Sequence, residues 1–169
     1  EGQVTIEGVT HPLPRPMMVI GSQMPYGGRG TYPLTTVQAD RFLLHGQSGM
    51  PSPEEEREIV GAIDRIERNV VNPVVGPQAI LDLRREVAMV HVSPLIVQYI
   101  LSLLEVIRAH QSVAEPVSPR VGIALFKASR AAAYLDGRDF VLPDDVKALF
   151  GSVVHHRLVL KPESEADGR

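Results

Sequence analysis

Residues 118–149 constrain the fold more than any other stretch of the chain. Ser118 is a good N-cap, and Pro119 suits the first helical position, where a missing N–H costs no hydrogen bond. An Ala-rich run follows, and Gly137 ends it because glycine tolerates left-handed backbone angles. Pro143 and the two acidic residues after it then open another helix. The stretch therefore predicts two helices joined by a short extended segment.

The first of these helices, which we expect to end near Leu135, carries a basic stripe. Arg120 and Lys127 are seven residues apart and so lie on nearly the same face, with Arg130 beside them. The other faces are almost wholly apolar, which predicts a packed helix. A basic stripe on a packed helix could hold an anion, and a solvated basic face is the alternative interpretation.

Composition limits the classes of function. The 169 residues are 44% hydrophobic and 22% charged, as in globular proteins, and the net charge of −3 argues against nucleic-acid binding through bulk electrostatics. The absence of cysteine excludes disulfides, iron–sulfur clusters and cysteine-type zinc sites, and it is compatible with a cytoplasmic location. His155 and His156 are adjacent and would point about 100° apart on a helix, so we expect no metal site. No apolar run is long enough for a membrane span.

The N-terminal part has β character. Residues 3–13 alternate around a Glu7-Gly8 turn, which predicts a short hairpin. Residues 17–20 are a continuous apolar run, typical of a strand covered on both faces in an α/β sheet. A polar Gly-Ser-Gln loop follows, and ligands gather at such strand ends. The chain starts without methionine, and we expect it to be a piece of a longer protein.

The rest of the chain is expected to be helical. Residues 35–44 predict a short helix capped by threonine, and the turn-rich linker 46–53 is the predicted domain boundary. Further helices are expected over residues 53–69, 77–89 and 94–109. The last of these is apolar on nearly all sides and should be the spine of a bundle. The polar tail from Pro162 should be frayed.

Most catalytic motifs are missing from the sequence. It contains neither the GxxxxGK[ST] phosphate loop nor the GxSxG nucleophile elbow, and its paired acids stand at helix starts as capping groups. Arg41 and Arg120 remain as candidates, because each is expected at a helix end beside a loop, where a guanidinium can bind phosphate oxygens. A surface or ion-pair role is the alternative for each.

Several motifs follow one another along residues 1–161: EGQVTIEGVTHPLPRP, GSQMP, GTYPL, QADRF, SPR and DGRDFVLPDDVKALFGSVVHHRL. Together they resemble the C-terminal half of MoxR-type AAA+ ATPases. The resemblance implies a mixed, mainly α fold. Residues 1–47 would be the end of the α/β nucleotide core, with a pre-sensor 1 hairpin, the sensor 1 strand and an arginine-finger helix. Residues 48–161 would be the helical lid, and residues 162–169 a frayed tail.

The same resemblance implies roles for individual residues. Arg41 would be the arginine finger offered in trans to a neighbouring subunit, and Arg120 would be sensor 2, with Pro119 beside it at the ATP phosphates. Gln23 and Met24 would occupy the sensor 1 loop. Met24 replaces the family's asparagine, and a thioether cannot orient a water molecule as an amide can.

The resemblance also implies a function. It predicts ATP with Mg²⁺, a homo-oligomeric ring of six subunits, and chaperone-like remodelling or metal-cofactor insertion in client proteins, with von Willebrand factor A domain proteins as partners. The phosphate-loop lysine and the Mg²⁺-binding acids lie upstream in this family, so the chain alone is expected to be inactive. Two alternatives stay open: a non-catalytic helical interaction module, and a nucleic-acid-remodelling relative that uses the hairpin, where His11 and Arg15 are the basic residues.

Overall fold

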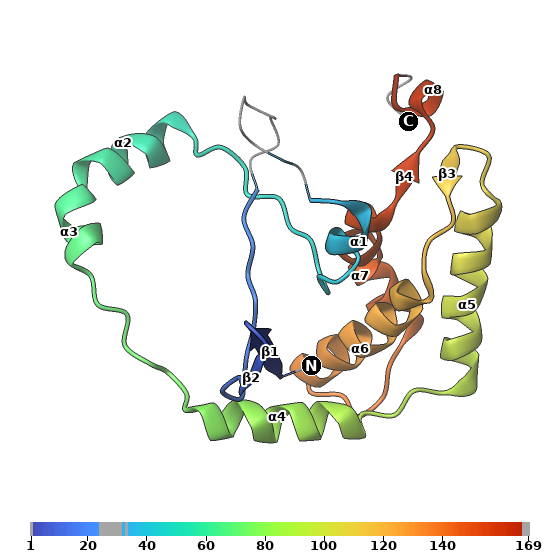
Figure 1. The fold of residues 1–169 in the computed structure, drawn as a ribbon, viewed down its shortest axis with the longest axis horizontal. Helices are drawn as coiled ribbons and strands as arrows, with labels where there is room; N and C mark the ends of the chain where they lie inside the picture. Colours follow the sequence, from blue (N-terminus) through green and yellow to red (C-terminus); the bar gives the residue numbers. More distant parts are fainter. Residues whose placement is uncertain (1, 24–31, 33, 167–169) are drawn as a thin grey trace.

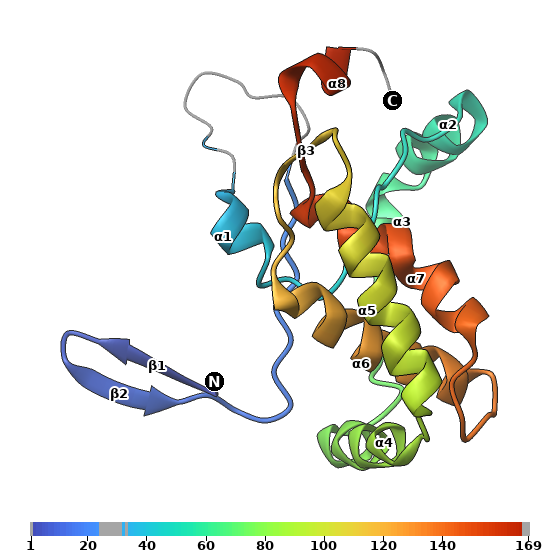
Figure 2. The same cartoon turned by 90° about the vertical axis from the view of Figure 1, so that its right-hand side faces the viewer.

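The computed structural model describes residues 2–23, 32 and 34–166, and three helices of the C-terminal half form its core. These are α5 (Pro94–Ala109), α6 (Pro119–Leu135) and α7 (Pro143–Val154). Helix α6 packs against both of the others (Figures 1 and 2). The largest fully buried side chains of the core are those of Leu104, Leu125, Val121, Val146 and Val153. The prediction of a mainly α chain with a helical bundle is confirmed.

Helix α6 is the centre of the bundle because its packed faces carry small and branched apolar residues. A Cβ atom added at Gly122 would lie 3.1 Å from Leu104 Cδ1, so this glycine lets α5 approach closely. The prediction that α5 is the spine is wrong. Only one of its faces is buried, and Leu95 on another face is 80% exposed.

The connection from α6 to α7 is built by the predicted glycine. Gly137 has φ of 74°, and its N–H donates to Tyr134 O at 2.9 Å, while Arg138 N–H donates to Ala133 O at 2.9 Å. This is a Schellman C-cap, in which the αL residue satisfies the last helical carbonyls. The cap turns the chain so that Arg138 comes to lie beside the first turn of α7.

Arg138 and Asp145 form a bidentate pair there. The nitrogen–oxygen distances are 2.9 and 2.6 Å, and Asp145 also accepts a 2.7 Å hydrogen bond from the backbone N–H of Leu142, the N-cap of α7. Arg138, together with that backbone N–H, lowers the pKa of the Asp145 carboxyl. A leucine side chain has no oxygen to cap the helix, so the Asp145 carboxylate accepts from the N-cap N–H and, with Arg138, fixes the start of α7.

Short extended segments and one further helix border the bundle. Helix α4 (Pro77–Met89) has the predicted bounds, and the extended segment after it forms a parallel bridge between His91 and Phe140. Strands β3 (Val113–Glu115) and β4 (Val159–Leu160) pair antiparallel, a contact that the sequence did not predict.

The N-terminal hairpin is formed as predicted, with β1 (Gln3–Ile6) and β2 (Val9–Pro12) in antiparallel register. Glu7 and Gly8 both have positive φ, as a type I′ turn requires. The strand predicted at residues 17–20 is wrong, because this segment is extended without strand pairing and its side chains are exposed. No other strand among the described residues lies beside it, so its backbone has no ladder to join.

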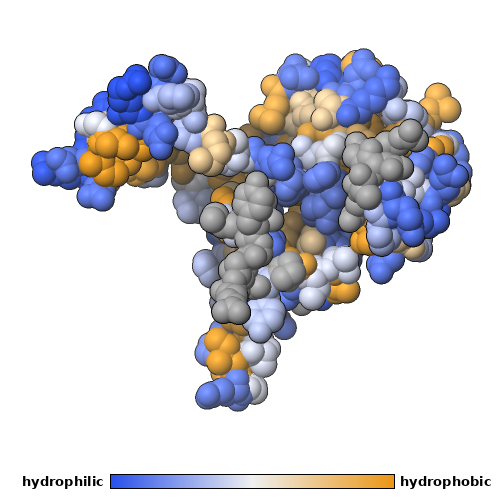
Figure 3. All heavy atoms as spheres, turned by 90° about the horizontal axis from the view of Figure 1, so that it is seen from above, coloured by the Kyte–Doolittle hydropathy of each residue, from blue (hydrophilic) through white to orange (hydrophobic). Residues whose placement is uncertain are grey.

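The helix predicted over residues 35–44 is shorter than expected. Helix α1 (Thr36–Ala39) begins with a capping box between Thr35 and Gln38 and ends at Asp40. Residues 53–69 form two helices instead of one, α2 (Pro53–Gly61) and α3 (Ile63–Arg68), with a break at Ala62. These two helices stand apart from the bundle and carry an exposed apolar patch (Figure 3).

The segment after α1 is attached to the end of α7. The N–H of His45 donates to Ser152 O at 2.7 Å, and His156 Nε2 lies 3.0 Å from Phe42 O, where it must carry the proton because a carbonyl only accepts. His156 belongs to the short 3₁₀ helix η1 (His155–Arg157). Its buried Nδ1 has no partner among the described residues.

The C-terminal tail differs from the prediction of a frayed segment. Residues Pro162–Ala166 form a short helix, α8, whose first residue is proline, a favoured residue at that position. Within the described part of the chain, no helix combines the length and the apolar character that crossing a membrane requires.

Asp145→Asn should lower the free energy of unfolding by about 1–3 kcal/mol near pH 7, because Arg138 loses its charged partner. The folded-state pKa of Asp145 is lowered, so the pair stabilises the fold above the unfolded pKa of about 4 and that stability is lost as the pH falls through the folded pKa. Urea unfolding from pH 7 to pH 3 should therefore show a weaker acid dependence for the variant. Asp144→Asn, at an exposed neighbouring position, is the matched control, and equal losses in the two variants would contradict the assignment.

His156→Gln should weaken the pH dependence of stability between pH 7.5 and 5.5. Burial lowers the pKa of His156, Arg157 and His45 lower it further, and the Phe42 carbonyl and Asp40 oppose the shift. The unfolded chain thus binds the proton more readily, and the wild-type free energy of unfolding should fall as the pH drops below about 6.5. Glutamine can still donate to Phe42 O but does not titrate. Parallel stability curves for wild type and variant would exclude this role for His156.

Candidate functional site

Asp40 is the meeting point of three segments that are far apart in the sequence. Its carboxylate accepts hydrogen bonds from Ser118 Oγ at 3.0 and 3.1 Å and from Arg157 Nε at 3.1 Å. Arg120 Nε lies 3.8 Å from its other oxygen. The Asp40 cluster, meaning Asp40 with Ser118, Arg120 and Arg157, therefore joins the end of α1, the start of α6 and η1.

The guanidinium of Arg157 is the most buried charge of this cluster, with a side chain that is 4% exposed. Nε donates to the Asp40 carboxylate, and Nη2 donates to the backbone oxygens of Asp40 at 3.2 Å and of Phe42. Nη1 donates to the backbone oxygens of Leu43 at 3.3 Å and of Val153. An arginine has five N–H donors, and all five have an acceptor here.

The electrostatic balance of this buried arginine depends on Asp40. Burial lowers the pKa of Arg157, and the Asp40 carboxylate opposes that shift by attraction and by its hydrogen bond. Removing a charge from water costs several kcal/mol, and a buried pair is tolerated when the remaining donors are also satisfied. Four backbone carbonyls and one carboxylate meet that condition.

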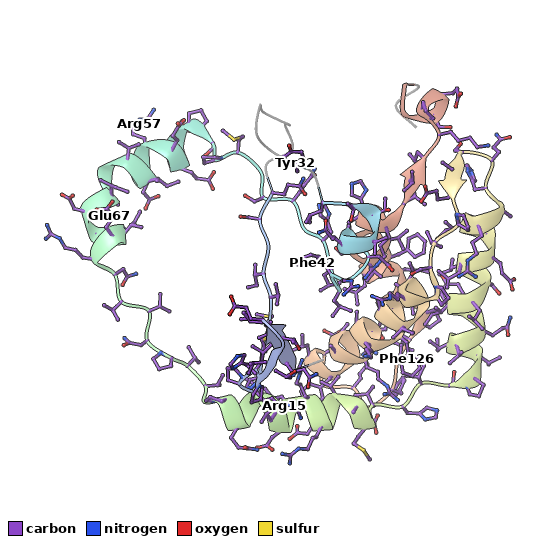
Figure 4. All side chains as sticks on the ribbon, in the orientation of Figure 1. Arg15, Tyr32, Phe42, Arg57, Glu67 and Phe126 are labelled. Carbon is purple, nitrogen blue, oxygen red and sulfur yellow. The ribbon has the colours of Figure 1, made fainter. Side chains whose placement is uncertain are left out.

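The Asp40 cluster also explains why α1 ends early. The backbone carbonyls of Asp40, Phe42 and Leu43 accept from Arg157, and Phe42 O also bonds His156, so these groups do not continue a helical ladder. Phe42 is labelled beside α1 in Figure 4. The chain between these carbonyls contains Arg41.

Of the two arginines predicted to bind phosphate, Arg120 belongs to this cluster and Arg41 is the next residue after Asp40 in the chain. Arg41 follows Asp40 directly and is exposed, and Arg120 lies in the first turn of α6 with a side chain that is 58% exposed. Among the described residues, no hydrogen bond or ion pair engages the side chain of Arg41 or the Nη atoms of Arg120. Each guanidinium can therefore still bind an anion.

The other predicted site residues are not hydrogen-bonding partners within the Asp40 cluster. Pro119 begins α6 beside Ser118 and is exposed. Gln23 is exposed at the end of the extended segment. Met24, the residue at the predicted sensor 1 position, lies outside the described residues. In the part of the chain that is described, no cluster of three His, Asp or Glu side chains is arranged to hold a metal ion.

Three members of the cluster were not predicted as site residues: Asp40, Arg157, and Ser118 in its role as a hydrogen-bond donor to Asp40. Ser118 was interpreted as a helix cap, and it does bond Arg120 N–H at 3.2 Å, but the same hydroxyl donates to Asp40. Arg157 gives no local signal, because its partners in the α1 segment lie 114 to 117 residues away. An arginine next to two histidines, at the end of an amphipathic helix, has the pattern of an ordinary C-terminal turn.

Comparison with known proteins accounts for both ends of the chain. Residues 1–44 match the ATPase family associated with various cellular activities (AAA), and residues 106–169 match the AAA lid domain. The uncharacterized protein YeaC of Bacillus subtilis is 38% identical over 169 residues, covering 99% of this chain and 53% of that protein. Chaperone MoxR1 of Mycobacterium tuberculosis is 34% identical over 176 residues, covering 99% of this chain and 46% of that protein.

A solved structure also resembles the whole chain. The crystal structure of a putative ATPase from Cytophaga hutchinsonii superposes with a TM-score of 0.88 at 31% identity, and the match covers 99% of this chain and 54% of that one. The chain thus spans about half the length of the relatives that it matches. It belongs to the MoxR-like AAA ATPases, and it carries the C-terminal end of their AAA core followed by the AAA lid domain.

Proposed function

We propose that this chain supplies two phosphate-binding arginines to an ATPase that hydrolyses ATP with Mg²⁺ in a ring of six subunits. Arg41 acts as the arginine finger in trans, and Arg120 acts as sensor 2. The observation that carries the proposal is their convergence on Asp40: Arg41 adjoins Asp40 in sequence, and Arg120 Nε lies 3.8 Å from its carboxylate. Their closeness to Asp40 supports a shared target for two cations from separate segments of the chain.

The geometry also bears on which nucleotide each arginine serves. Arg120 Nε lies 3.8 Å from the carboxylate of Asp40, the residue that precedes Arg41, so a nucleotide that Arg41 reaches on a neighbouring subunit would lie close to Arg120 as well. Phosphoryl transfer is catalysed largely by positioned cations that meet charge on the transferred group. In this arrangement Arg41 meets the γ-phosphate and Arg120 holds the phosphates in place, with Pro119 and Gln23 beside the site.

The remaining groups of the reaction lie outside the described residues. Mg²⁺, when bound, would neutralise part of the charge on the phosphates. In this proposal its ligands belong to the part of the relatives that this chain does not cover. Residues 1–47 are then the end of the nucleotide core and residues 48–161 the lid, with Met24 at the sensor 1 position.

The ATPase cycle would drive chaperone-like remodelling or metal-cofactor insertion in client proteins, with von Willebrand factor A domain proteins as partners and a cytoplasmic location. The name of the mycobacterial relative, a chaperone, supports this class of activity. The hairpin offers the nucleic-acid alternative little support, because its described strands contain His11 as their one basic residue.

Arg41→Ala in the full-length protein should lower the kcat of ATP hydrolysis by roughly 10³-fold, the range that arginine fingers supply. Arg120→Ala should cost about 10- to 100-fold in kcat/KM, as expected for a lost charged hydrogen bond to phosphate. Steady-state phosphate release measures both. Lys127→Ala, on the exposed face of the same helix, is the matched control and should stay close to wild type. Normal turnover in the Arg41 and Arg120 variants would disprove the assigned roles.

The 169-residue chain by itself should release no phosphate from ATP above background. It has no GxxxxGK[ST] loop to cradle the phosphates, and two arginines cannot replace that loop. Isothermal titration with ATP and Mg²⁺ together with a phosphate-release assay tests this directly. Magnesium-dependent hydrolysis that disappears in the Arg120→Ala chain would show the opposite.

A further inference from the structure

We infer that Arg157 is a positioning residue for the arginine finger: it fixes the backbone on both sides of Arg41 from the lid. This inference rests on the proposed function of Arg41. In this role Arg157 does not contact the nucleotide and acts through the segment around Arg41.

Arg157 binds the chain on both sides of Arg41. Its donors bind the Asp40 carboxylate and the backbone oxygens of Asp40, Phe42 and Leu43, so the residue before Arg41 and the two residues after it are held by one guanidinium. Its fifth donor binds Val153 O in α7. The planar fork of arginine presents these donors in fixed directions, so the bound segment has little freedom to rotate.

Arg157 is itself anchored in the helical lid. It lies in η1, directly after α7, and its side chain is 4% exposed. Helix α7 is locked in the bundle by fully buried Val146 and Val153. Additional bonds from the same region, His156 to Phe42 O and His45 N–H to Ser152 O, attach the same segment to it. The segment that carries Arg41 is therefore attached to the lid, and Asp40 is bound by two lid residues, Ser118 and Arg157.

The attachment to the lid would keep Arg41 in place for catalysis. Helix α1 has only four residues and none of them is buried, so α1 by itself is a weak support for an exposed side chain. A catalytic cation that is displaced by about 1 Å can lose roughly 10²-fold in rate. The clamp by Arg157 restricts the backbone of Arg41 without occupying its side chain.

Arg157→Lys is the test variant, because lysine keeps the positive charge but has three donors instead of five and no planar fork. In the full-length protein we expect kcat to fall roughly 10- to 100-fold while the KM for ATP stays within about twofold, because the nucleotide contacts remain and the geometry of Arg41 is lost. Arg138→Lys is the matched control. It disrupts another arginine–aspartate pair of the lid, with a further bond to Phe140 O, and none of its hydrogen bonds or ion pairs involves residues 40–43.

Trypsin cleavage at Arg41 gives a second readout that does not depend on ATP. Cleavage requires the backbone around Arg41 to adopt an extended form, which the bonds to Arg157 oppose. In Arg157→Lys the cut after Arg41 should become about tenfold faster, as expected from the loss of two hydrogen bonds, while the cut after Arg57 in α2 keeps its rate. Asp40→Asn tests the same clamp from its other side and should change both readouts in the same direction.

The outcomes separate the two proposals. If Arg41→Ala leaves kcat unchanged, the proposed finger is wrong. If Arg41→Ala lowers kcat but Arg157→Lys and Asp40→Asn do not, Arg41 is a finger that Arg157 does not position. If the cuts after Arg41 and Arg57 accelerate together, or Arg138→Lys reproduces the kcat loss, Arg157 has only a general structural role and the inference is overturned.

Discussion

One buried guanidinium holds the site together. Arg157 satisfies its five donors with a carboxylate and four backbone carbonyls, and three of these carbonyls belong to the segment around Arg41. Without it, the segment at residues 40–43 would lose four of the hydrogen bonds that attach it to the lid, and those from Ser118 to Asp40 and from His156 to Phe42 O would remain. Because Asp40 balances the charge of Arg157 and also binds Ser118, the same pair sets where α1 ends, how α6 begins and where both candidate phosphate-binding arginines lie.

The bundle supports this arrangement through local rules that are independent of the site. Ser93 and Ser118 cap their helices, Gly137 provides the left-handed residue that ends α6, and Asp145 fixes the start of α7 through Leu142 N–H and Arg138. The caps at the end of α6 and the start of α7 determine the angle between these two helices, and η1 continues directly from α7. The position of Arg157 is thus a consequence of the helix caps of the lid.

The sequence predicted what depends on neighbours in the chain. The bounds of α4, α5 and α6, the Glu7-Gly8 hairpin and the threonine cap of α1 all follow from caps, turns and periodicity within a few residues. The early end of α1, the β3–β4 pair and the Asp40 cluster depend on partners that are distant in sequence, and no local pattern identifies them. The exposed outer face of α5 and the unpaired segment at residues 17–20 were mispredicted because apolar character shows that a surface needs a partner but does not show which residues supply it. Family resemblance pointed to Arg41 and Arg120, and the fold added the residues that hold them.

The central claim is that the lid, through Arg157, sets the finger for a neighbouring nucleotide. The most direct measurement is a structure of the full-length ring with an unreactive ATP analogue and Mg²⁺. The account predicts that Arg41 lies within hydrogen-bonding distance of the neighbour's γ-phosphate while Arg157 still binds the backbone oxygens of Asp40 and Phe42. An Arg41 that contacts the γ-phosphate with Arg157 released from this segment, or one that points away from every nucleotide, would contradict it.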